Sequence, residues 1–148
     1  MLEGRVYDKL DSMMEMANRA ALLIDAARRE SGPHAGIAIS DTELALERAL
    51  YRAIQDLLDV AAMIAASIDP TPWTTYRGAI EILGAAEVLP PSALPGLREM
   101  AGFRNILAHE YGDVDRDRVL GFEAHMSDFE AFARSVVTYL DRSGSQAR

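Results

Sequence analysis

The sequence contains no cysteine, and it has only one tryptophan and one lysine, Lys9. The absence of cysteine excludes disulfide bonds, thiolate zinc sites and cysteine nucleophiles, and it fits a reducing compartment. No apolar run approaches the roughly 18 residues that a transmembrane helix needs. The first residues, MLEGRVYDKLDSMMEM, are acidic where a signal peptide would be apolar. We therefore expect a soluble, cytoplasmic protein.

Positive charge is also scarce relative to negative charge. The formal net charge is −8 over 148 residues, which argues against broad, non-specific attraction to nucleic acid because an acidic surface repels phosphate. A small basic cleft remains compatible with this balance. All basic residues except Lys9 are arginines. Arginine suits planar contacts with phosphate or carboxylate, although genomic base composition can produce the same bias.

Apolar residues are plentiful, at 49% of the chain, and they recur at steps of three and four rather than two. This periodicity predicts an all-α antiparallel bundle of about five helices. Ser40 followed by Glu43 is a capping-box pattern at the start of the second helix. We expect one domain over residues 1–142 and a flexible tail over 143–148. The first three expected helices cover about residues 3–29, 40–68 and 73–88. A fourth begins near residue 92 and reaches the motif described in the next paragraph, and a fifth has apolar positions from Val119 to Leu140.

The stretch FRNILAHEY places four polar side chains close together: Arg104, Asn105, His109 and Tyr111. At about 100° per residue, Asn105 and His109 fall on one helix face, and Arg104 would align with Tyr111 if the helix continued that far. Gly112 is a natural residue to end the helix. We therefore expect His109 and Tyr111 in the last turn, beside a cleft beyond the helix end.

Histidine exchanges a proton near neutral pH, and a nearby arginine can stabilise charge on a phosphoryl group. The pair Arg104 and His109 therefore suits metal-free phosphodiester cleavage, with the 2′-hydroxyl of RNA as an internal nucleophile. A symmetric dimer would bring two copies of this sparse set across one cleft. On spacing alone, an arginine and a histidine five residues apart on a helix are more often a helix-capping group and a surface ion pair than a catalytic pair.

FRNILAHEYGDVD, preceded by YRGAIEILGAAEVLPPSALPGLREMAG, closely resembles the HepT-like family of HEPN ribonucleases, the toxin halves of prokaryotic toxin–antitoxin pairs. The family signature is Arg, a polar residue, three further positions, His, one position and Tyr. Arg104, Asn105, His109 and Tyr111 match it at every defining position. The similarity includes ALERALYRAIQDLLDVAAMI and the last helix, so it covers roughly residues 40–140.

This resemblance implies a homodimeric HEPN-like domain that acts as a metal-independent endoribonuclease toxin of a type VII-like pair, needs no cofactor and leaves a 2′,3′-cyclic phosphate. It implies that His109 is the general acid/base, that Arg104 holds the scissile phosphate and that Asn105 orients one of them or the RNA. The implied partner is a minimal nucleotidyltransferase that silences the toxin by adding AMP to Tyr111. A bulky anion at that position would fill the cleft and repel RNA.

Two further arginines, Arg116 and Arg118, follow the motif closely enough to contact RNA or an AMP group. His125 is expected to be structural or exposed, and the three scattered histidines have no zinc-binding spacing. A competing hypothesis from another class is a non-catalytic helical dimer that binds a nucleotide or docks a nucleotidyltransferase. The strong negative charge is the feature that favours this alternative.

Overall fold

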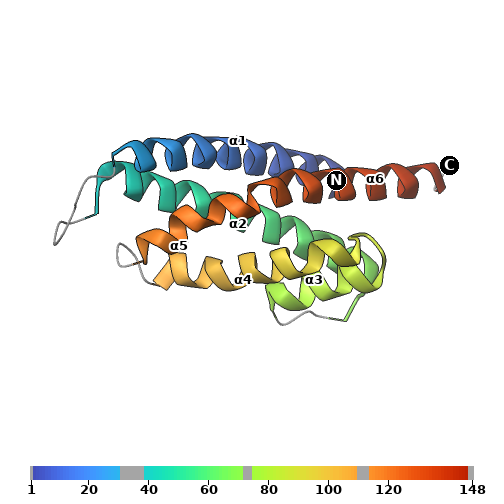
Figure 1. Cartoon of the computed structure of the whole chain (residues 1–148). Coiled ribbons are helices and arrows are strands. Elements are labelled where there is room, and N and C mark those ends of the chain that lie inside the picture. The colour runs from blue at the N-terminus through green and yellow to red at the C-terminus, as the bar shows by residue number, and fades with distance from the viewer. Residues whose placement is uncertain (1, 31–38, 72–74, 110–113, 147–148) are drawn as a thin grey trace.

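The computed structural model describes residues 2–30, 39–71, 75–109 and 114–146. These residues form helices and connecting turns without a β-strand, which confirms the predicted all-α class. None of the helices in these ranges is long and apolar enough to cross a membrane. In chain order the elements are α1 (Leu2–Arg29), α2 (Asp41–Ile68), α3 (Tyr76–Ala85), the 3₁₀ turn η1 (Pro91–Ala93), α4 (Leu94–His109), α5 (Arg116–Gly121), the 3₁₀ turn η2 (Phe122–His125) and α6 (Met126–Gln146) (Figure 1).

The two longest helices, α1 and α2, run antiparallel side by side and form the most extensive helix–helix contact (Figure 1). The predicted capping residue is confirmed at the start of α2, where Ser40 Oγ accepts a hydrogen bond from the backbone N–H of Glu43. All apolar positions of the stripe predicted for α1 are buried, because they recur along one face of the helix. They are Val6, Leu10, Met13, Ala17, Ala20, Ile24 and Ala27.

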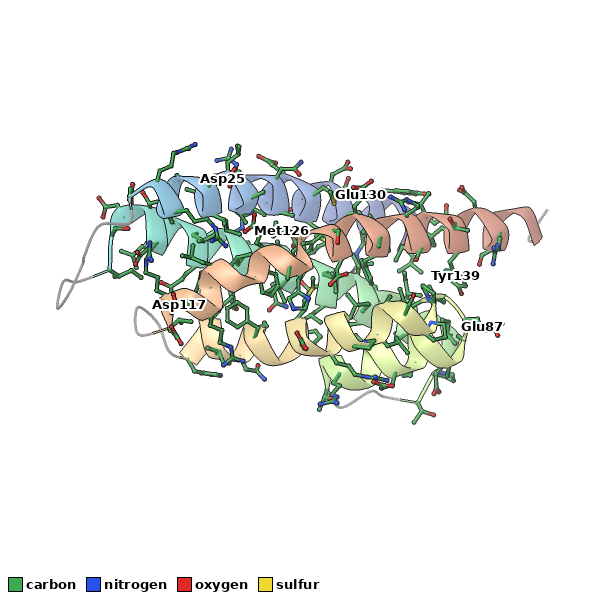
Figure 2. All side chains as sticks on the ribbon, viewed as in Figure 1. Asp25, Glu87, Asp117, Met126, Glu130 and Tyr139 are labelled. Atoms are coloured by element: carbon green, nitrogen blue, oxygen red, sulfur yellow. The ribbon has the colours of Figure 1, made fainter. Side chains whose placement is uncertain are left out.

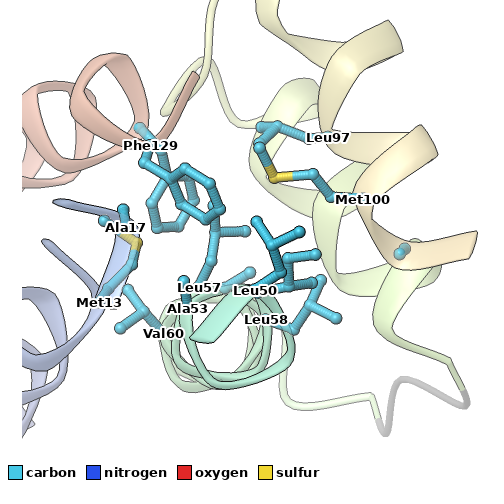
Figure 3. Packing of buried hydrophobic residues seen from close by; sticks show 14 of the residues in the cluster. Met13, Ala17, Leu50, Ala53, Leu57, Leu58, Val60, Leu97, Met100 and Phe129 are labelled. Atoms are coloured by element: carbon cyan, nitrogen blue, oxygen red, sulfur yellow. The ribbon is translucent and has the colours of Figure 1, made fainter. Parts of the chain in front are cut away.

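Helix α2 lies at the centre of the bundle and has apolar side chains on several sides. In Figure 3, Leu57 and Val60 of α2 lie toward α1 and α6, while Leu50 and Leu58 lie toward α4. All four of these side chains are fully buried. The outer faces of the other helices carry charged side chains, such as Asp25 and Glu130, which project away from the core (Figure 2). Helix α2 is therefore the element against which α1, α3 and α4 are all positioned.

The first half of α4 is fixed by two glycines at close helix contacts. A Cβ on Gly84 of α3 would lie 2.9 Å from Leu94 Cδ1, and a Cβ on Gly96 would lie 2.5 Å from Asp128 Oδ2 of α6. A side chain at either position would therefore force the Leu94 or Asp128 side chain to move. Arg98 adds an ion pair, donating from Nε and Nη2 to Glu81 of α3 at 2.6 and 2.9 Å.

The last predicted helix is divided in the structure into α5, η2 and α6, and the chain changes direction between them (Figure 1). Phe122 lies at this point with its ring stacked on Phe103 of α4, at a centroid distance of 5.1 Å. Gly121 precedes it and weakens the helix locally. The tertiary contact with α4 therefore decides where the helix breaks. Helix α6 continues to Gln146, through part of the segment expected as a tail.

Candidate active site

The described part of the motif, Phe103 to His109, occupies the second half of α4. Phe103 and Leu107 are buried and fix the helix against the bundle. Asn105 and His109 are exposed, and His109 lies in the last turn of α4. Arg104 is half-buried, because it leaves the helix toward α2 rather than toward the outer face. The five-residue step from Arg104 to His109 corresponds to about 140° of helix rotation, so their side chains leave one helix in different directions.

Arg104 is held by neutral groups from three helices. Its Nε donates to Gln55 Oε1 of α2 at 2.9 Å, and its Nη1 donates to Asn105 Oδ1 at 3.1 Å. Its guanidinium carbon lies 5.8 Å from the ring centroid of Tyr51 and 5.7 Å from that of Tyr76. Cation–π contacts of this kind stabilise a guanidinium without neutralising its charge. We call Gln55, Asn105, Tyr51 and Tyr76 the neutral frame of Arg104.

A second set of hydrogen bonds fixes the frame itself. Gln55 Nε2 donates to Asp59 Oδ1 at 2.8 Å and to the Tyr76 hydroxyl oxygen at 3.0 Å, and that hydroxyl donates to Asp59 Oδ1 at 3.2 Å. Because its amide nitrogen is bonded in this way, Gln55 presents its carbonyl oxygen to Arg104. The orientation of Arg104 therefore depends on α2 and α3 as well as on α4.

Two carboxylates next to the frame, Asp56 and Asp59, share one cation from α1. Lys9 Nζ lies 3.1 Å from Asp59 Oδ2 and 3.4 Å from Asp56 Oδ1. Ser12 Oγ donates to Asp56 Oδ2 at 2.6 Å. The hydrogen bond to Asp59 outweighs desolvation and raises the pKa of Lys9 above its ordinary value. The direct ion pair of Asp59 is therefore with Lys9, and its contact with Arg104 runs through the neutral side chains of Gln55 and Tyr76.

The other arginines that the sequence singled out have different surroundings. Arg116 is half-buried, and it donates to Glu43 Oε1 at 2.6 Å and to the backbone carbonyl of Ala27 at 3.0 Å. It thus ties α5 to α2 and to the end of α1. Arg118 is exposed and lies over the Phe103 ring, 5.5 Å from its centroid. An RNA or AMP contact by either residue stays a prediction, and Arg118 has the more accessible side chain.

Tyr111, the predicted site of modification, lies outside the described residues, as do Glu110, Gly112 and Asp113. No cluster of three or more potential metal ligands is present in the described ranges. Both ring nitrogens of His125 contact carboxylates: Nε2 lies 2.8 Å from Glu99 Oε2 of α4, and Nδ1 lies 3.1 Å from Asp128 Oδ2 of α6.

Sequence reasoning did not identify Tyr51, Gln55 and Tyr76 as site residues. Tyr51, Gln55 and Asp59 recur at four-residue steps on α2, which is the one available signal in the sequence. That signal cannot indicate which distant residue they contact.

Comparison with known proteins agrees with this architecture and motif. The family model described as "Ribonuclease HepT-like" matches residues 13–136. A tRNA nuclease HepT of Aphanizomenon flos-aquae (strain 2012/KM1/D3) is 26% identical over 102 residues, which cover 68% of this chain and 69% of the relative. Among solved structures, a tri-AMPylated HEPN toxin of Shewanella oneidensis in complex with MNT antitoxin superposes with a TM-score of 0.75. The superposition covers 90% of this chain and 97% of the toxin, at 18% identity, and it supports the fold. With a family match over most of its length, and with Arg104, Asn105 and His109 of the signature on α4, the chain belongs to the HepT-like ribonuclease family.

Proposed function

We propose that this chain is a metal-independent endoribonuclease toxin that uses Arg104 and His109. The observation that carries the proposal is the neutral frame around Arg104. Among the described residues, the hydrogen bonds and cation–π contacts of its guanidinium all go to uncharged groups. Two of the five N–H donors of an arginine are used in those bonds, and the others can bind phosphate oxygens. A half-buried, uncompensated guanidinium is suited to stabilise a phosphorane-like transition state.

His109 supplies the proton transfer in this proposal. The 2′-hydroxyl oxygen of RNA attacks the adjacent phosphorus, a P–O bond forms there, and the bond from phosphorus to the 5′-oxygen breaks. The base takes the 2′-hydroxyl proton, and an acid returns a proton to the leaving 5′-oxygen, which yields a 2′,3′-cyclic phosphate and a 5′-hydroxyl. Histidine performs both steps near neutral pH. Because Arg104 and His109 diverge on one helix, we propose that a homodimer brings the arginine of one chain to the histidine of the other.

The test is cleavage of a mixed tRNA and mRNA pool in EDTA. We expect His109→Ala and Arg104→Gln each to lower cleavage at least about 100-fold, since general acid/base catalysis and charge stabilisation each contribute about that much. The matched control is Arg134→Gln, whose arginine is exposed and paired with Glu130 on α6. Mass measurement of every preparation identifies any covalent AMP. A wild type that is dimeric, unmodified and inactive in EDTA would contradict the proposal and favour the non-catalytic binding module.

We further propose that a minimal nucleotidyltransferase neutralises this toxin by modifying Tyr111. The related Shewanella oneidensis toxin is AMPylated and bound to MNT antitoxin, which supports the same regulation here. In the proposed step the phenol oxygen attacks the α-phosphorus of ATP and pyrophosphate leaves. Tyr111→Phe should keep cleavage but gain no AMP mass and escape inhibition. An inactive Phe variant would instead place the hydroxyl in the cleavage chemistry.

A further inference from the structure

A row of alternating cations and aromatic rings extends from Arg104 along α2. The Arg48 guanidinium lies 5.5 Å from the Tyr51 ring centroid, and Arg104 lies within 5.8 Å of both Tyr51 and Tyr76. We call Arg48, Tyr51, Arg104 and Tyr76 the Arg–Tyr row. Rings and guanidinium planes are the surfaces on which unpaired RNA bases stack.

Part of this row is held in place before any ligand arrives. Gln55 and Asp59 bind Arg104 and the Tyr76 hydroxyl from the side of α2. Arg48 is exposed at the end of the row, and Tyr51 is half-buried. The row therefore presents a fixed inner part and an accessible outer part, and a preorganised surface loses less conformational entropy on binding.

The charge around the row differs from that of the whole chain. Arg48 and Arg52 are exposed one turn apart on α2. Arg52 also lines a groove that contains three cations, Arg52, Arg5 and Lys9, and two carboxylates, Asp8 and Asp56. The exposed arginines Arg19 and Arg134, in contrast, are paired with glutamates on their own helices. In a chain of net charge −8, this local excess of cations complements a phosphate backbone.

The outer part of the row lies toward the same end of the bundle as His109. Helices α2 and α4 run antiparallel (Figure 1), and Gln55 meets Arg104 between them. From that contact, Arg48 lies toward the start of α2 and His109 lies at the end of α4, so both are displaced toward the same end of the bundle. A strand that binds Arg104 and continues toward that end passes Tyr51 and Arg48.

We propose that Arg48, Tyr51 and Arg52 form a binding subsite for single-stranded RNA beside the phosphate held by Arg104. A base stacks on the outer part of the row, and Arg48 and Arg52 contact the flanking phosphates. The subsite rests on the proposed ribonuclease function, but it makes a separate claim about affinity.

Binding is measured in a His109→Ala background, which separates affinity from cleavage. The probe is a fluorescent single-stranded RNA of about 12 nucleotides, a length within the roughly 4–16 nucleotides that single-strand-binding domains of another fold cover. Fluorescence anisotropy is recorded over a range of salt concentrations. Arg48→Gln should weaken binding about fivefold to tenfold and reduce the salt slope by about one. Tyr51→Leu should weaken binding about tenfold with little change in slope, while Tyr51→Phe, which keeps the ring, should bind like the parent.

Arg19→Gln and Arg134→Gln are the controls, because they make the same charge change on α1 and α6. Both should bind within twofold of the parent. The subsite is overturned if Arg48→Gln binds like these controls, if duplex RNA competes as well as single strands, or if the parent binds no RNA. Loss of the parent's oligomeric state in Arg48→Gln would assign the row to a subunit contact and also overturn it.

Cleavage assays on variants that retain His109 distinguish the proposed subsite from the proposed ribonuclease function. Wild-type kcat/KM in Arg48→Gln would remove the subsite and leave the ribonuclease function standing. RNA binding that depends on Arg48, in a chain that does not cleave RNA, would support the subsite and contradict the ribonuclease function.

Discussion

The arginines of this chain differ in their surroundings more than in their exposure. Arg19, Arg98 and Arg116 each lie against a carboxylate. Arg104 instead lies among amide groups and aromatic rings. A surface ion pair consumes the charge of its arginine for little stability, whereas the neutral frame keeps that charge available. The environment of Arg104, more than its identity, makes it suitable for phosphate binding.

A change of one atom in the frame tests this interpretation. Gln55→Glu places a carboxylate against the Arg104 guanidinium, so it should lower kcat/KM for RNA about tenfold or more by competing with phosphate. Gln55→Met is the matched neutral variant and should lose less activity. Cleavage assays with melting curves for both variants provide the measurement. A Glu variant as active as wild type would contradict the role given to the neutral frame.

The sequence indicated the motif residues as candidates for the site, but it did not indicate the frame. Arg104 and His109 belong to a local pattern that specifies its own spacing. The contact between Gln55 and Arg104 joins residues 49 positions apart. Such a contact depends on how α2 and α4 pack, and a single sequence carries no direct record of that packing.

At the scale of helices, periodicity predicted the main elements because each has one dominant buried face. It did not predict the division into α5, η2 and α6, because the apolar pattern continues across the break. Phe122 of η2 stacks on Phe103 of α4, and a contact between two separate elements produces no periodic pattern in the sequence. Local pattern thus determines which residues are helical, and tertiary contacts determine where a long helix bends.

The polar bridge between α1 and α2 should make stability depend on pH. The pKa of Lys9 is raised in the folded chain, chiefly by the hydrogen bond to Asp59. Its stabilisation is therefore fully present below the pKa of lysine in the unfolded chain, and it is lost as pH rises through the higher folded pKa. Lys9→Met should lower the free energy of unfolding by about 1 kcal/mol at neutral pH, since the Lys9 side chain is 41% exposed and solvent screens its ion pairs.

Urea unfolding between about pH 8 and pH 11 measures this difference. The difference in unfolding free energy between wild type and Lys9→Met should become smaller as the pH approaches 11. Arg5→Met, one turn away on α1, controls for the loss of a long side chain. Its difference in unfolding free energy from wild type should stay constant over this pH range. A difference for Lys9→Met that does not change with pH would contradict the electrostatic explanation.

At the scale of the whole molecule, the proposed site requires two chains. Chains carrying Arg104→Ala and chains carrying His109→Ala should each be inactive alone. A heterodimer purified with two different tags should recover about half of the wild-type rate, because one of its two composite sites contains an intact arginine and an intact histidine. A heterodimer as inactive as its parents would contradict a site built from two chains.

The anchoring of α4 at Gly96 and Arg98 has a consequence for the length of the motif helix. A helix of sixteen residues is rigid, so the rotation set at its first half determines where each later side chain points. One extra residue between Arg98 and Arg104 would turn the guanidinium by about 100° and carry it away from Gln55, while the anchor stayed intact. Substitutions on the outer face of α4 leave that rotation unchanged. The number of residues between the glycine and the arginine is therefore as much a part of the site as the arginine itself.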